Sequence, residues 1–241
     1  MPRFYIPHTP LTHALLKLPD AAAHHAARVL RLSVGDRVTL FDGSGQEWLA
    51  SIHYIDKRDV EVGVEACLSV SRESPLAVTL VQGISSGDRM DYTLQKAVEL
   101  GVARIQPLAC ARSVVKLAGE RADKRRSHWQ NLVIAACEQC GRNVVPEVAA
   151  VNTLPGWLAG PPAQPLRIMF APDAAATLHT LAKPEAGVEI LAGPEGGFNA
   201  DEYRLAGEAG FIPVRLGPRV LRTETAAVAA LSAMQVLWGD F

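Results

Sequence analysis

The sequence predicts an α/β protein in which a parallel sheet covered by helices follows a smaller β domain. From Leu76 onward, five short apolar runs alternate with segments of helical spacing. Runs that are too short for helices and apolar on both faces are typical of strands buried in a parallel sheet. The first 70 or so residues instead alternate apolar and polar side chains with a period of two, which is typical of antiparallel strands. A length of 241 residues accommodates both parts.

The N-terminal part is predicted to form a short helix followed by a β meander. Residues 20–32 have helical spacing, and residues 36–55 and 59–67 alternate, with glycine turns at Gly43 and Gly45. This pattern predicts a small β barrel or sandwich. The polar stretch that ends at Pro75 is predicted to be a linker.

The C-terminal part is predicted to contain five strands and five helices. The strands are expected at residues 77–81, 104–109, 166–171, 188–192 and 212–216. The helices are expected at residues 92–100, 121–141, 174–181, 200–209 and 225–237. In sheets of this kind, ligands bind outside the carboxyl ends of the strands.

Two glycine-proline loops, residues 191–198 and 216–226, follow predicted strands and are candidate binding loops. Proline stiffens such a loop, and glycine allows close backbone approach. Neither loop has the spacing of a phosphate-binding loop. Asn199 is expected to cap the next helix with Asp201 and Glu202 in its first turn, where they would repel an anion. The predicted ligand is therefore neutral or cationic.

Two arginines in the second loop, Arg219 and Arg222, precede a helix that is predicted to begin at Thr223. A cation is unfavourable at a helix N-terminus, so two arginines in a stiff loop at this position indicate a functional role. They are expected to pair with Glu195 or Glu224, or to hold an RNA phosphate.

The charge distribution is uneven, although the net charge is only −1. Residues 104–142 carry eight Lys or Arg against three acids, whereas residues 143–215 carry four against eight. A local basic zone suits phosphate contacts with RNA, and a solvated helix face is the alternative.

Composition also bears on location and metals. No apolar run has the length that a bilayer requires, and residues 1–10 do not have the pattern of a cleavable leader. The four cysteines do not form a disulfide framework, and Cys137 and Cys140 have no further ligands at zinc-site spacing. We therefore expect a cytoplasmic protein with no membrane segment and no metal.

Several motifs resemble one known family. Residues 193–198 (GPEGGF) and 216–226 (LGPRVLRTETA) resemble the cofactor loops of the SPOUT methyltransferases, most closely those that methylate N3 of a uridine in 16S ribosomal RNA. Further matches lie at residues 24–36, 96–102, 112–117 and 138–142, where Cys140 replaces the serine of the family pattern.

The resemblance implies a PUA-like β-barrel domain for RNA at residues 1–72 and a methyltransferase domain with a deep trefoil knot at residues 73–241. It also implies a homodimer, S-adenosylmethionine (SAM) as methyl donor, and 16S rRNA in the small ribosomal subunit as partner. The implied function is SAM-dependent methylation of N3 of a uridine in 16S rRNA. The alternatives are ribose 2′-O methylation and a non-catalytic ribosome-assembly factor.

The resemblance further implies site residues. The cofactor would contact Phe170, Leu191, Gly193, Glu195, Gly196, Gly197, Leu216, Gly217, Val220, Leu221, Thr223, Thr225 and Ala226. The catalytic candidates are Arg222, Arg219 and Glu195. The arginines would stabilise charge on uracil oxygens or hold a phosphate, and Glu195 or Glu224 would accept the N3 proton or fix an arginine. RNA would contact Arg28, Arg31, Arg112, Ser113 and Arg142. Arg28 and Arg31 are expected on one helical face, and ion pairs are the alternative role for these basic residues.

Overall fold

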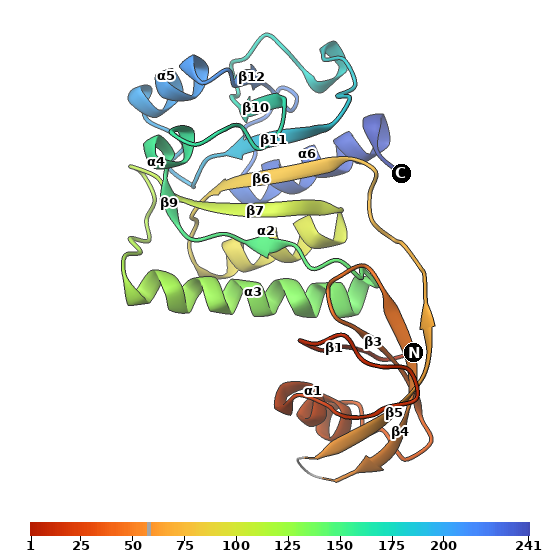
Figure 1. Ribbon diagram of the computed structural model, residues 1–241. Coiled ribbons are helices and arrows are strands. Elements are labelled where there is room, and N and C mark those ends of the chain that lie inside the picture. Colours follow the sequence, from red (N-terminus) through yellow and green to blue (C-terminus); the bar gives the residue numbers. More distant parts are fainter. Residues whose placement is uncertain (57–58) are drawn as a thin grey trace. The chain divides into compact units, whose positions relative to one another are not determined.

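The computed structural model describes residues 1–56 and 59–241. The chain forms two compact units (Figure 1). The N-terminal unit combines Met1–Glu73 with Cys137–Val145, and the C-terminal unit combines Ser74–Ala136 with Pro146–Phe241.

A five-stranded sheet, in the order β1-β3-β4-β5-β2, forms the N-terminal unit. The strands are β1 (Arg3–Tyr5), β2 (Leu15–Lys17), β3 (Arg37–Phe41), β4 (Glu47–Ile55) and β5 (Val60–Leu68). Strands β3, β4 and β5 pair antiparallel in sequence order, which confirms the predicted meander. Strand β1 adds in parallel to β3.

The helix of this unit is shorter than predicted. Helix α1 (Asp20–His24) continues as a π-helical segment, His25–Val29. Ala23 and Ala26 are fully buried in the same apolar cluster as Trp48. The expectation that Arg28 and Arg31 share a helical face is wrong. The helix has ended before Arg31, whose φ of 55° is in the left-handed region.

A seven-stranded parallel sheet forms the centre of the C-terminal unit, in the order β12-β10-β11-β6-β7-β8, with β9 also paired to β7. The strands are β6 (Ala77–Gly83), β7 (Val102–Ala109), β8 (Glu147–Val148), β9 (Asn152–Thr153), β10 (Leu166–Phe170), β11 (Gly187–Ala192) and β12 (Ile212–Val214). All five predicted strands are present.

Five helices belong to the same part of the chain. They are α2 (Gly87–Glu99), α3 (Glu120–Cys140), α4 (Leu154–Leu158), α5 (Ala200–Glu208) and α6 (Thr223–Trp238). Four of the five predicted helices are confirmed. The prediction of a helix at residues 174–181 is wrong. Ala176 forms a β-bridge with Val214, and the segment contains only one 3₁₀ turn, Leu178–Thr180.

The sheet is covered on both faces. Every residue of β11 is buried, which requires side chains to pack against both of its faces. Helices α2 and α6 lie side by side on the sheet (Figure 1), where α2 packs on β7 and α6 on β11. The predicted fold class is therefore confirmed. Within the described residues, no helix combines the length and apolarity needed to span a bilayer.

Candidate functional site

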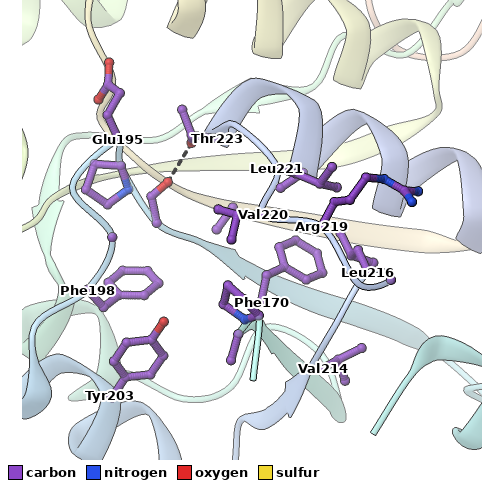
Figure 2. Close-up of a pocket in the computed structure, with 18 residues that line it drawn as sticks. Phe170, Glu195, Phe198, Tyr203, Val214, Leu216, Arg219, Val220, Leu221 and Thr223 are labelled. Carbon is purple, nitrogen blue, oxygen red and sulfur yellow. Dashed lines mark hydrogen bonds between the residues drawn. The ribbon is translucent and has the colours of Figure 1, made fainter. Parts of the chain in front are cut away.

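A cavity of about 200 Å³ lies at the carboxyl ends of β10, β11 and β12 in the C-terminal unit (Figure 2). The two glycine loops line the same cavity, so they lie side by side as the sequence predicts. Phe170 comes from the end of β10, and Val220 and Leu221 come from the second loop. These side chains give the cavity apolar walls.

Most of the expected cofactor residues line this cavity. They are Phe170, Gly193, Glu195, Gly197, Leu216, Gly217, Val220, Leu221, Thr223 and Ala226. Three others do not line it. Leu191 is buried in β11, and Thr225 is exposed on α6. A Cβ on Gly196 would lie 2.8 Å from the Cβ of Arg112, so this glycine permits close packing outside the cavity.

Some lining residues were not predicted. They are Ala171, Pro172, Ala192, Pro194, Phe198, Tyr203 and Val214. The Phe198 and Tyr203 rings meet edge to face with centroids 5.8 Å apart. Phe198 lies inside the GPEGGF motif, so the sequence could have identified it as a lining residue. Tyr203 could not be identified from the sequence, because it lines the cavity only as a result of the orientation of α5.

Helix α5 begins with a cap that directly follows the first loop and joins the helix to Ala111. The Asn199 side chain accepts a hydrogen bond from the Glu202 backbone N–H (2.8 Å), and the Glu202 carboxylate accepts one from the Asn199 backbone N–H (2.9 Å). The second carboxylate oxygen of Glu202 accepts a bond from the backbone N–H of Ala111. This capping box confirms the predicted helix start. It also leaves a negative charge beside the loop, which disfavours an anionic ligand.

The two acids near the cavity share an arginine that the sequence reasoning missed. Glu195 Oε1 accepts bonds from the N–H and hydroxyl of Ser86, both at 2.8 Å, and from Arg89 Nη1 at 3.3 Å. Arg89 Nε lies 4.0 Å from Glu224 Oε1. Within the described residues neither Arg219 nor Arg222 pairs with these acids, so the first of the two roles expected for the loop arginines is wrong. Arg89 precedes the predicted start of its helix, so the pattern assigned it to a loop.

The environment of Glu195 makes it a weak base. Burial raises the pKa of this carboxyl, but the bonds from Ser86 and the charge of Arg89 outweigh burial and lower the pKa overall. A carboxylate with a lowered pKa accepts a proton less readily. The geometry therefore favours the second of the predicted roles, in which Glu195 fixes an arginine, and that arginine is Arg89.

The loop arginines differ in position. Arg219 lines the cavity (Figure 2), whereas Arg222 occupies the N-cap position of α6 and does not line it. Both are exposed. In residues 1–56 and 59–241, neither forms an ion pair. Both guanidinium groups are available to a ligand.

The other basic candidates separate into two groups. Arg28 and Arg31 are exposed and, within the described chain, form no ion pair with Asp20, Asp36 or Asp42.

Arg112, Ser113 and Arg142 form hydrogen bonds within the protein. Arg112 is exposed, but its Nη1 donates to the carbonyls of Gly196 and Phe198, both at 3.3 Å, and so supports the first loop. Ser113 is buried, and its backbone N–H and hydroxyl close a turn on Cys110. Arg142 is buried and donates from Nε and Nη2 to Glu73 Oε2. For Arg142 the structure shows the ion-pair alternative, and burial keeps Ser113 from an RNA surface.

The sequence matches models of two known protein domains. A model of the RNA methyltransferase domain matches residues 72–235, and a model of the RNA methyltransferase PUA domain matches residues 18–65. The fold, the loops and these matches define an RNA methyltransferase that carries a PUA domain.

Individual relatives show which family of RNA methyltransferases the chain belongs to. The Ribosomal RNA small subunit methyltransferase E of Buchnera aphidicola (subsp. Acyrthosiphon pisum) is 33% identical over 100% of this chain and 95% of its own length. The enzyme of that name from Bacillus subtilis is 32% identical over 90% of each chain. The chain belongs to the ribosomal RNA small subunit methyltransferase E family.

Solved structures are also similar. The Neisseria gonorrhoeae Ribosomal RNA small subunit methyltransferase E bound to S-adenosyl methionine has a TM-score of 0.93 and 44% identity, and the match covers 100% of this chain and 99% of that one. A Legionella pneumophila protein in complex with bound SAM has a TM-score of 0.96 and 42% identity, with 99% and 98% covered.

Proposed function

We propose that this protein uses SAM to methylate N3 of a uridine in 16S rRNA of the small ribosomal subunit. The observation that carries the proposal is the meeting of the two glycine loops in one apolar cavity. Support comes from relatives named as small-subunit rRNA methyltransferases and from similar structures that hold SAM.

The cavity suits SAM chemically. SAM carries a cationic sulfonium and no phosphate, which agrees with the acids around the first loop. A Cβ on Gly197 or Gly217 would meet no atom within 4 Å, so ligand atoms can approach the backbone at both glycines. Phe170, Val220 and Leu221 would pack on the adenine ring. When bound, SAM supplies a methyl group already activated by the positive sulfur.

The remaining chemical requirement is activation of N3 of the uridine. The uridine must pass its N3 proton to Glu224 or to water before N3 can attack the methyl carbon, and an anion then develops on the uracil ring. We propose that Arg222 and Arg219, whose charges no acid of the described chain neutralises, stabilise that anion or hold a neighbouring phosphate. Glu195 is held by Ser86 and Arg89. Positioning of the two reactants then supplies much of the rate.

The same proposal covers domains and assembly. Residues 1–72 would serve as the RNA-binding domain through Arg28 and Arg31, and residues 73–241 as the methyltransferase domain. We also propose that the enzyme acts in the cytoplasm as a homodimer.

Mass spectrometry of rRNA from cells that lack the gene tests the proposal. We expect one methyl group to disappear from a uridine base of 16S rRNA and to return with the gene. Loss from a ribose would instead indicate 2′-O methylation. Calorimetry with SAM supplies the control, because a protein that does not bind SAM would fit an assembly factor.

A further inference from the structure

Gln82, the penultimate residue of β6, is fully buried and does not line the cavity, yet it contacts both loops that do. Its Nε2 donates to Gly83 O and to Thr223 Oγ1, both at 3.0 Å, and approaches Gly193 O at 3.5 Å. Backbone carbonyls only accept hydrogen bonds. The amide nitrogen, rather than its oxygen, must therefore face them.

This orientation determines where the Thr223 hydroxyl points. A hydroxyl has a single proton to donate, and Thr223 Oγ1 already accepts from Gln82. Its proton is therefore committed to Gly193 O, at 2.6 Å (Figure 2). The result is a directed series of two bonds, from Gln82 to Thr223 and from Thr223 to Gly193. It joins β6 to the start of α6 and to the first loop.

Packing at the next residue reinforces this connection. A Cβ on Gly83 would lie 2.5 Å from Pro194 Cδ and 2.6 Å from Pro194 N. The first loop therefore rests directly on the end of β6. Gly83 sets the distance between strand and loop, and the bonds that begin at Gln82 set the position of the second loop against the first.

We propose that Gln82 is a positioning residue that sets the spacing of the two loops for SAM, an inference that rests on the proposed function. Gln82 acts through Thr223 and Gly193 and makes no contact of its own with the cavity. Its loss is therefore expected to weaken SAM binding and raise the KM for SAM. The turnover number at saturating SAM should change little, because the RNA-facing arginines are not affected.

Gln106 provides a matched control. It is a buried glutamine on the neighbouring strand β7, and its Nε2 donates to Pro107 O (2.9 Å) and Ala150 O (2.8 Å). It has no bond to either loop in the described structure. Gln82→Glu and Gln106→Glu each replace an amide that donates two hydrogens to its acceptors with a carboxyl that donates one at most. We expect similar losses of thermal stability from the two changes.

Calorimetry with SAM separates the two variants. We expect Gln82→Glu to raise the Kd for SAM by about tenfold or more, since one directed hydrogen bond is lost, and Gln106→Glu to leave it within about twofold. Equal Kd values for both variants would overturn the inference. Wild-type protein that fails to bind SAM would contradict the proposed function instead.

A second pair of variants covers the case in which Gln82→Glu does not fold. Thr223→Val keeps the side-chain shape and removes the hydroxyl, whereas Thr223→Ser keeps the hydroxyl. We expect Thr223→Val to weaken SAM binding about tenfold. Thr223→Ser should recover most of that loss, with similar melting temperatures for the two. Unchanged SAM affinity in Thr223→Val would also overturn the inference.

Discussion

Arg31 adopts a backbone conformation that its side chain disfavours. Its φ of 55° is in the region that glycine normally occupies after a helix. Arg31→Gly should relieve this strain and stabilise the protein by roughly 0.5–1 kcal/mol, after allowance for the greater freedom of glycine in the unfolded chain. RNA binding should weaken in the same variant if Arg31 contacts RNA. Urea unfolding and a filter-binding assay measure the two effects, and Arg28→Gly, within the helix, should destabilise.

In residues 1–56 and 59–241 the four cysteines are present as thiols, and they should differ in reactivity. Burial raises the pKa values of the Cys110 and Cys137 thiols to about 12, so both stay protonated at pH 8. Only a thiolate attacks a disulfide reagent. We expect the exposed Cys67 to react with an aromatic disulfide first and the half-buried Cys140 more slowly. Cys110 and Cys137 should react only in denaturant, and fast labelling of either in the native protein would contradict this prediction.

Arg222 allows catalysis and cofactor binding to be separated. It lies outside the cavity, at the N-cap of α6. Arg222→Ala should therefore abolish methyl incorporation while it leaves the SAM affinity and the melting temperature close to those of wild type. A variant that still methylates rRNA would remove Arg222 from the mechanism.

At the scale of elements, the cap of α5 should contribute measurably to stability. Asn199→Ala removes the side chain that accepts the Glu202 N–H and should cost about 1 kcal/mol. Asn199→Ser retains an accepting oxygen and serves as the control. Urea unfolding at pH 7 measures the free energy of unfolding of both variants. Equal values for Asn199→Ala and wild type would show that the cap does not contribute to stability.

The elements that the sequence predicts well are those whose pattern repeats over several residues. The apolar runs of β6, β7, β10, β11 and β12 and the helical spacing of α2, α3, α5 and α6 were all identified. Strands β8 and β9 have two residues each, which is too short for a repeating pattern. The segment at 174–181 has helical spacing, but pairing of Ala176 with Val214 overrides it.

The candidate site was predictable where motifs are contiguous. The two glycine loops, and with them ten of the thirteen expected cofactor residues, line the cavity. Residues brought in by tertiary structure were missed. Arg89 reaches Glu195 from α2, and Gln82 reaches Thr223 from β6. A single sequence contains no spacing that relates such positions.

At the scale of the molecule, the N-terminal unit is built from two separate stretches of chain. The segment Cys137–Val145 joins Met1–Glu73 through a bond from the Tyr5 N–H to Glu138, and through the pair of Arg142 with Glu73.

Removing the cation from the pair of buried Arg142 with half-buried Glu73 tests the contribution of that pair to stability. Arg142→Met leaves Glu73 without its main cation and should destabilise the protein by roughly 3 kcal/mol. Arg121→Met, at an exposed position on α3, should change stability by less than about 0.5 kcal/mol. Urea unfolding compares the two variants. A small loss for Arg142→Met together with weakened RNA binding would favour the RNA-contact role.

The discontinuous N-terminal unit has a consequence for synthesis on the ribosome. Cys137 follows Glu73 by 64 positions, which take roughly 3–13 s to translate. During that interval the emerging N-terminal unit lacks the segment Cys137–Val145, and Tyr5 and Glu73 lack their partners Glu138 and Arg142. The nascent unit therefore completes its packing only after the whole of α3 has been made, because Val145 follows the end of that helix at Cys140.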